Sequence, residues 1–331
     1  MSKFDKIRAA VEGEELDEIA VSVWWHFPGR DLNARDLCEM QLEFQRRFDP
    51  DLMKVCPSGG YPSIAFGAEI EYYGSPTGAP RTKVPRIRSA EDWGALEELD
   101  VQDGVLGEMV RAVECIGRGL EGRVPFIQTV FSPLTICLKI GDGRLLGDLR
   151  SEPDGVEEAL EVISRTMAEF ARANMDAGAS GLFFATQMAT LDRLTEDEYR
   201  RFGVRYDLPV LRAVRSRAFI NVVHIHGENI MFDLIAESYP ADALNWHDQR
   251  TPPSLADASE RFPGALLGGI DERNTLVKGT TDDVEAMVKD AVKDVSGRRL
   301  ILAPGCVIPL AAPPSNLDAV IRTARSYKDW R

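Results

Sequence analysis

The sequence predicts an α/β protein folded as a single (β/α)8 TIM barrel. Eight short and almost continuously apolar segments occur along the 331 residues, and apolar residues recur at helical spacing between them. Eight strands that alternate with helices pair in parallel through βαβ units, and a closed barrel is the simplest way to bury both faces. An open doubly wound sheet is the alternative, but no GxGxxG pattern of its dinucleotide-binding form follows the first strand.

The expected strands are rich in β-branched and aromatic residues, and they cover residues 19–25, 52–56, 126–131, 181–186, 219–226, 243–246, 265–270 and 300–303. Helical spacing is clearest after the third strand, at Val156, Leu160, Ile163, Met167 and Phe170. A second clear helix is expected over residues 284–295, after a start signal at 281–282.

One connection is much longer than the others. Residues 57–125, between the second and third strands, contain several glycines and prolines. We expect an elaborated loop with a hairpin around residues 70–73 and a helix near 104–116. Long loops of this kind shape the active sites of barrels, and residues 1–331 are expected to form one domain around it.

Composition excludes several classes of protein. No segment approaches the ~20 apolar residues of a membrane span, and the N-terminal residues lack a signal-peptide core. The net charge of −14 disfavours nucleic acid as a partner, and a cytoplasmic location is expected. The five cysteines are scattered and odd in number, so we expect free thiols or metal ligands rather than disulfides.

All four histidines lie at the C-terminal ends of expected strands. His26 follows the first strand, His224 and His226 end the fifth, and His247 ends the sixth. The carboxyl ends of barrel strands form one rim, where active sites are built. A single histidine of this kind is more often a satisfied buried residue, but four on one rim favour a functional site.

A metal site is the most specific prediction. Residues 224–226 read His-Ile-His, and alternation along a strand turns both imidazoles to one face. Cys306 follows the eighth strand and adds a thiolate at the same rim. Two imidazoles and one thiolate suit zinc and leave a fourth position open, with Glu228 as a further ligand or as a partner of an imidazole.

Several motifs of this chain resemble the uroporphyrinogen decarboxylase superfamily, whose fold is a (β/α)8 barrel. They are residues 224–228 (HIHGE), 243–246 (ALNW), 267–271 (LGGID), 305–309 (GCVIP) and 313–316 (PPSN), with 24–30 (WWHFPGR) similar to an early arginine-rich loop. The resemblance spans nearly the whole chain. It implies the barrel fold, and the decarboxylases among its members are commonly dimers.

The decarboxylase branch binds an acidic tetrapyrrole, and this chain departs from its pattern. The first arginine position is His26, so only Arg30 remains, and no acid stands near residues 57–59, where the branch has an aspartate. Lys139, Thr186 and Gly305 replace its tyrosine, serine and late histidine.

The second branch contains corrinoid-dependent methyltransferases, in which H-x-C and a late Gly-Cys bind zinc. Here His226 stands where that branch has cysteine. The resemblance therefore implies transfer of a methyl group between a corrinoid, free or on a partner protein, and a thiol or folate.

Other residues at strand ends are expected to line the site. His26 and Arg30 are candidates to hold an anionic group, Gln187 is a candidate cofactor contact, and the remaining catalytic candidates are Gln128, Thr186, Asn245, His247 and Asp271. The alternative is a metal-dependent hydrolase or lyase with Asp271 or His247 as general base.

Overall fold

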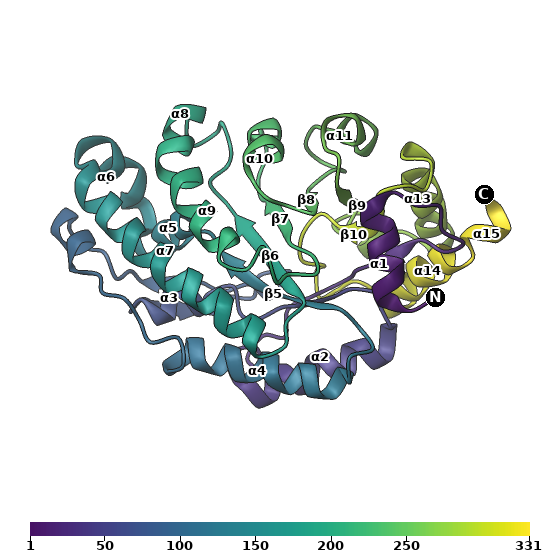
Figure 1. The fold of residues 1–331 in the computed structure, drawn as a ribbon, viewed down its shortest axis with the longest axis horizontal. Helices are drawn as coiled ribbons and strands as arrows, with labels where there is room; N and C mark the ends of the chain where they lie inside the picture. The colour runs from purple at the N-terminus through teal and green to yellow at the C-terminus, as the bar shows by residue number, and fades with distance from the viewer.

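The computed structural model describes residues 1–331, and its centre is an eight-stranded parallel sheet that curls into a barrel-like shape (Figure 1). The strand order is β1-β10-β9-β8-β7-β6-β5-β2. The strands are β1 (Ala20–Val21), β2 (Met53–Val55), β5 (Phe126–Phe131), β6 (Gly181–Thr186), β7 (Val222–Ile225), β8 (Ala243–Trp246), β9 (Ala265–Ile270) and β10 (Leu300–Pro304). Every one of them is fully buried, which explains their continuous apolar sequences. The expected α/β class and all eight expected strands are therefore present.

Helices cover the outside of the curled sheet (Figure 1). The α-helices are α1 (Lys3–Glu12), α2 (Ala34–Phe48), α3 (Tyr61–Ala65), α4 (Gly104–Leu120), α5 (Pro133–Gly141), α6 (Leu145–Ser151), α7 (Pro153–Asp176), α8 (Glu196–Tyr199), α9 (Arg205–Arg212), α10 (Phe232–Ser238), α11 (Leu255–Arg261), α12 (Thr275–Lys278), α13 (Thr281–Asp294), α14 (Pro314–Arg325) and α15 (Tyr327–Trp330). Two short 3-10 helices cover Ala90–Ala95 and Asp142–Arg144, and a short π-helix covers Arg200–Val204. The two best-marked helices of the sequence correspond to α7 and α13, and Thr280 caps α13 through its side chain.

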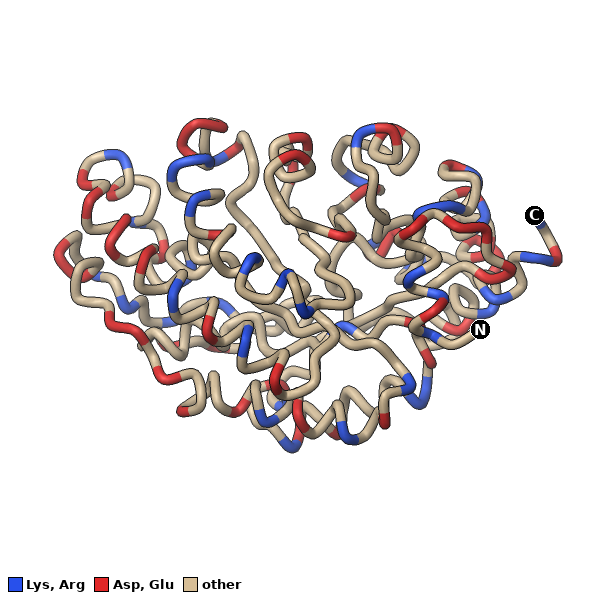
Figure 2. Tube along the Cα trace, in the orientation of Figure 1, with Lys and Arg blue, Asp and Glu red and all other residues tan.

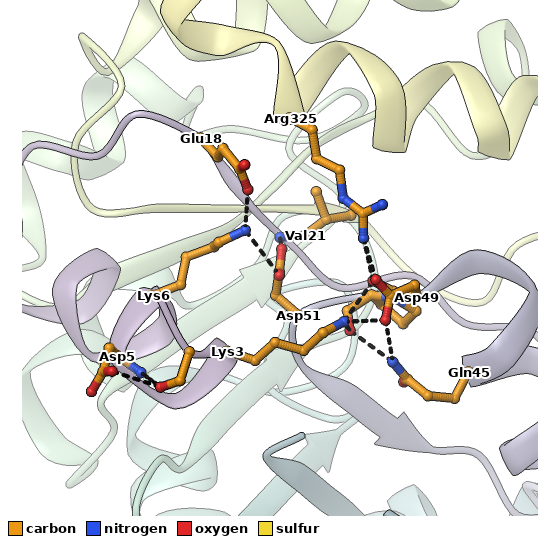
Figure 3. Close-up of polar contacts among 11 residues, drawn as sticks. Lys3, Asp5, Lys6, Glu18, Val21, Gln45, Asp49, Asp51 and Arg325 are labelled. Atoms are coloured by element: carbon orange, nitrogen blue, oxygen red, sulfur yellow. Dashed lines mark hydrogen bonds and ion pairs between the residues drawn. The ribbon is translucent and has the colours of Figure 1, made fainter. Parts of the chain in front are cut away.

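The two edge strands of the sheet meet. The backbone amides of Asp51 and Leu52, just before β2, both donate hydrogen bonds to the carbonyl of Val21 in β1. The Asp51 carboxylate accepts a hydrogen bond from the Val21 amide at 3.0 Å and pairs with Lys6 at 3.1 Å (Figure 3). Side chains and loop backbone therefore join the edges where the strands are too short for a ladder.

The long connection between β2 and β5 carries its own small sheet. Strands β3 (Glu69–Glu71) and β4 (Arg81–Val84) pair antiparallel. β3 overlaps the expected hairpin around residues 70–73, but its partner lies further along the chain, at residues 81–84. Helix α4 begins at Gly104, as expected, and continues to Leu120. This segment brings Thr77, Ala79 and Pro80 to the cavity described below.

The expectation that all cysteines are free thiols is wrong for two of them. Cys38 in α2 and Cys115 in α4 form a disulfide, with Cα atoms 6.0 Å apart. Spacing gave no signal because the pair is 77 residues apart in the sequence, and it meets only because α2 and α4 pack side by side. Cys56, Cys137 and Cys306 remain free.

Charged residues lie mainly on the peripheral helices and loops, with acidic and basic side chains interspersed (Figure 2). No helix combines the length and the apolar character that a membrane span requires. Charge is thus concentrated away from the strands, whose side chains form one continuous core.

Candidate metal centre

Strand β7 delivers two imidazoles to one point. His224 lies within the strand and His226 one residue beyond its end, so alternation sends both side chains to the inner face. Their ring centroids are 5.7 Å apart. Phe183 of β6 stacks on His224 at 5.4 Å with an interplanar angle of 25°, which restricts the orientation of that ring.

Hydrogen bonds fix which nitrogen of His224 is available. The side-chain amide of Asn245 donates to the carbonyls of Leu267 and Pro304, at 2.9 and 3.0 Å, so its oxygen must face His224. That oxygen lies 2.6 Å from Nδ1 of His224 and can only accept a hydrogen bond from it. His224 therefore carries its proton on Nδ1 and presents the lone pair of Nε2, as a metal ligand must.

Cys306 and His247 both face the second imidazole. The Cys306 Sγ lies 3.8 Å from Nδ1 of His226, and Nε2 of His247 lies 3.3 Å from the same nitrogen. Nδ1 is thus the His226 atom that is turned toward the group. Single donor atoms of His224, His226 and Cys306 all lie within 4.8 Å of one another.

A buried carboxylate supports this arrangement from behind. Glu272, which follows β9 and is 2% exposed, lies 3.1 Å from Nδ1 of His247 through Oε1. Its other oxygen accepts a hydrogen bond from the backbone amide of Gly305 at 3.2 Å. One side chain thereby holds His247 and the loop that carries Cys306.

The protonation states suit metal binding. Burial alone would raise the pKa of the Cys306 thiol, but hydrogen bonds with His224, His226 and His247 outweigh burial and hold the pKa well below its ordinary value. Burial lowers the pKa of His224. Thiolate and neutral imidazole are the forms that coordinate a metal ion.

The donor set fits a zinc ion in kind and in spacing. Zinc binds nitrogen at about 2.0–2.1 Å and sulfur at about 2.3 Å, so two nitrogens and one sulfur at tetrahedral angles stand roughly 3.3–3.6 Å apart. The 3.8 Å between Cys306 Sγ and His226 Nδ1 is close to this spacing, and the 4.8 Å limit of the group requires only modest side-chain movements. Three protein donors leave one position for another molecule.

A cavity of about 230 Å³ adjoins the three donor residues. Aromatic side chains form much of its wall, including Trp24, Phe131 and Phe183. The polar residues among its lining are His26, Lys54, Thr77, Thr129, Lys139, Gln187, His224, His226, Arg273 and Cys306. Burial and the nearby Lys54 ammonium lower the pKa of His26 to about 4, so this imidazole is neutral at physiological pH.

The structure brings only some of the sequence-predicted residues together. His224, His226, His247 and Cys306 form the group, Asn245 orients His224, and His26 and Gln187 line the cavity.

Other candidates point elsewhere because alternation along a strand sends every second side chain outward. Gln128 contacts Asn174 of α7, and Thr186 contacts Tyr199 among the outer helices.

Three further candidates make contacts outside the lining. Arg30 is exposed and forms ion pairs with Asp36 and Glu39 at 3.4 and 3.3 Å. Glu228, whose side chain is 62% exposed, pairs with Arg250 at 2.9 Å. The Asp271 carboxylate accepts the amides of residues 273 and 274 at the entry to α12. Each is therefore accounted for by local structure.

Sequence reasoning missed Glu272, Lys54 and Arg273, and noted Lys139 only as a departure from a family pattern. Lys54 carried a readable signal, because a lysine inside a short apolar strand must be buried. Glu272 carried no such signal, since its contacts with His247 and Gly305 come from segments far along the chain.

Comparison with known families assigns this chain. Residues 17–327 match the family described as uroporphyrinogen decarboxylase (URO-D), and the chain belongs to that family. Like its relatives, it is an enzyme of the uroporphyrinogen decarboxylase superfamily.

Individual relatives fall into two activities. The methylcobamide:CoM methyltransferase MtbA of Methanosarcina mazei is 23% identical over 243 residues, which are 73% of this chain and 70% of that protein. The methylcobamide:CoM methyltransferase MtaA of Methanosarcina barkeri is 23% identical, covering 80% of this chain and 76% of its own. The uroporphyrinogen decarboxylase of Pseudoalteromonas translucida is also 23% identical, covering 89% and 84%.

Solved structures support the fold. A methyltransferase from Methanosarcina mazei superposes with a TM-score of 0.83 at 20% identity and covers 98% of both chains. A B12-independent methionine synthase from Shewanella superposes with a TM-score of 0.59 at 13% identity, covering 92% of this chain and 97% of its own. The curled parallel sheet is thus a shared architecture.

Proposed function

We propose that this enzyme is a zinc-dependent methyltransferase that moves a methyl group between a methylcobamide and a thiol or folate acceptor. The observation that carries the proposal is the convergence of His224, His226 and Cys306 on one point beside a cavity. The similarity to two methylcobamide:CoM methyltransferases supports methyl transfer as the type of reaction.

Zinc held by these residues would bind the acceptor atom in the open position and lower its pKa. Asn245 would keep the lone pair of His224 directed at the metal. Glu272 would hold the His247 imidazole and the loop that carries Cys306 in fixed positions relative to each other. The aromatic wall would exclude water from the acceptor, and the methyl-carrying corrinoid, alone or on a partner protein, would have to approach from outside because the cavity is too small for it.

The cavity lining supports methyl transfer over tetrapyrrole decarboxylation. The decarboxylase branch is expected to hold the pyrrole nitrogens with an aspartate, and Pro57 and Gly59 line the corresponding wall here. The lining contains no aspartate or glutamate at all. It therefore offers no carboxylate to accept hydrogen bonds from pyrrole N–H groups.

Methyl transfer can be tested directly. The zinc-loaded enzyme is mixed with methylcobalamin and a thiol, and loss of the methylcobalamin absorbance is followed together with the thioether formed. We expect turnover with the natural chain, and a loss of at least 100-fold in Cys306→Ala, whereas Cys137→Ala, which removes another buried free cysteine, should retain it. Absence of turnover with both thiols and folates, alongside release of carbon dioxide from a tetrapyrrole, would reverse the assignment.

A further inference from the structure

The cavity beside the metal ligands is strongly biased toward positive charge. Lys54, Lys139 and Arg273 line it and no carboxylate does, although the whole chain carries a net charge of −14. Arg273 is partly balanced by Glu272 at 3.9 Å. Apart from the Cys306 thiolate, every charged side chain of the lining is cationic, and a cavity of this kind inside an acidic protein favours an anionic ligand.

Lys54 lies at the centre of this bias. The residue is 5% exposed, and its ammonium sits 4.5 Å from the ring centroid of Phe183 and 5.3 Å from that of Trp24. Its one hydrogen bond, at 3.6 Å, is to the sulfur of Cys56. An ammonium has three donors, so most of its hydrogen-bonding capacity has no partner within the protein. Burying a charge in this way is unfavourable unless a partner arrives.

Lys139 is the second lysine whose ammonium lacks a carboxylate partner in this cavity. It lies in the last turn of α5, and its ammonium contacts the Phe131 ring with the centroid at 5.2 Å. Burial lowers the pKa of Lys139 to about 8 and outweighs the opposing influence of the Cys306 thiolate. The nearby carboxylates of Asp31 and Glu272 lie behind the lining, where they face His26 at 4.0 Å and His247 at 3.1 Å.

A single aromatic ring separates Lys54 from the metal ligands. Phe183 contacts the Lys54 ammonium and also stacks on the imidazole of His224. A molecule with its reactive atom at the metal and an anionic group at Lys54 would therefore need to span about one ring. Short chains of two to four atoms have this reach.

Cavity size restricts the molecule further. A volume of about 230 Å³ falls below the ~300–1,000 Å³ of pockets for drug-sized ligands. The macrocycle of a corrinoid is too large for such a cavity. An anionic group inside the cavity therefore belongs to a small acceptor and not to the phosphate of a corrinoid.

We propose that Lys54 and Lys139 form an anion subsite for the carboxylate, sulfonate or phosphate of a small methyl acceptor whose nucleophilic atom lies at His224, His226 and Cys306. This inference rests on the proposed methyl transfer for the identity of the ligand. It assigns recognition of the acceptor's anionic group to two residues outside the metal group.

The subsite can be tested by binding alone. Titration calorimetry on the purified chain compares 3-(methylthio)propionate with 3-(methylthio)propan-1-ol, two probes of equal length that differ in charge. We expect the acid to bind at least tenfold more tightly than the alcohol. Lys54→Met should remove about tenfold of that preference, and so should Lys139→Met, whereas Lys54→Arg should keep most of it. Lys293→Met, at a lysine whose side chain is 70% exposed, is the matched control and should leave it unchanged.

Equal binding of acid and alcohol by the natural chain would overturn the subsite, as would a preference that survives in a folded Lys54→Met/Lys139→Met double variant. Methyl transfer from methylcobalamin to 3-mercaptopropionate and 3-mercaptopropan-1-ol separates this proposal from the previous one. Preferential binding of the acid without methylation of either thiol would sink the methyltransferase function and leave the subsite standing. Methylation of both thiols at the same KM would support the methyltransferase function and overturn the anion subsite. An unchanged KM for methylcobalamin in Lys54→Met is expected, because the corrinoid lies outside the cavity.

Discussion

Asn245 is the residue on which the direction of the His224 lone pair depends. It is not one of the candidate metal ligands, yet its oxygen can only accept a hydrogen bond from Nδ1 because its nitrogen is used by two backbone carbonyls. Partners of this kind typically change metal affinity by about 10–100-fold. The interaction therefore belongs to the candidate metal site, although Asn245 does not contact the open position.

We predict that Asn245→Leu weakens zinc binding by about 10–100-fold, since the imidazole loses the hydrogen bond that selects its tautomer. Competition with a chromogenic chelator measures the affinity. Asn316→Leu is a matched control, because Asn316 is equally buried and also donates to two carbonyls, those of Leu276 and Gly279, far from any histidine. Equal zinc affinity in the natural chain and Asn245→Leu would show that the tautomer is set by something else.

Individual residues of the candidate metal centre were partly predictable from local sequence. The H-x-H spacing and the cysteine after the last strand were sufficient to find His224, His226 and Cys306, because strand alternation and barrel topology place them together. Gln128 and Thr186 were assigned to the same site, but they lie on the outward face of their strands. In a strand buried on both faces, an apolar neighbour on either side gives no sign of which face is inward.

At the scale of elements, a buried polar network holds three outer helices together. Asp207 of α9 is fully buried, and one carboxylate oxygen accepts hydrogen bonds from Tyr199 at the end of α8 and from Tyr239 just after α10. Burial raises the pKa of Asp207 to about 7, against an ordinary value near 3.8. Folding therefore favours the protonated acid.

This shift predicts how stability depends on pH. The folded-state pKa lies above the unfolded value, so the stabilisation is complete below about pH 4 and is lost as pH rises toward and through 7. Asp207→Asn stays neutral and should escape this loss, which is about 1.4 kcal/mol per pH unit and at most about 4 kcal/mol in all.

Urea unfolding at pH 4 and pH 8 tests whether Asp207 is buried in its protonated form. We expect the free energy of unfolding of Asp207→Asn to improve relative to the natural chain as pH rises, whereas the exposed Asp197→Asn should follow the natural chain at both pH values. A constant difference between Asp207→Asn and the natural chain across this range would contradict a buried, protonated carboxyl group.

At the scale of the whole molecule, closure of the sheet depends on a few polar groups at its edge. Strand β1 has only two residues and β2 has three, so the backbone ladder is short where the edges meet. Asp51 compensates by binding the Val21 amide and the Lys6 ammonium, while Asp49 joins Lys3 to Arg325 nearby (Figure 3). The eight strands were predictable because apolar segments alternate with helical patterns along the chain. This edge was not predictable, because its contacts join α1, β1 and the chain before β2.

The two aspartates of this edge make a matched comparison. Asp51 is 3% exposed and Asp49 has a side chain 53% exposed, yet each contacts a lysine. We predict that Asp51→Ala lowers the free energy of unfolding by about 2–4 kcal/mol, since it leaves a buried amide and a buried ammonium short of a partner. Asp49→Ala should cost about 1 kcal/mol or less, because exposed ion pairs contribute little. Urea denaturation measures the free energy of unfolding of both variants. Equal losses in Asp51→Ala and Asp49→Ala would mean that Asp51 does not close the edge.

The central claim for the whole molecule is that one zinc ion is held where β7 and the loop after β10 meet. Elemental analysis of the chain, purified without a histidine tag and dialysed against buffer, tests this claim most directly. We predict one zinc per chain, retained in Cys137→Ala and lost in His224→Ala/Cys306→Ala while both variants stay folded. Zinc that remains at one per chain in the double variant, or a natural chain that binds none when zinc is supplied, would contradict the assignment.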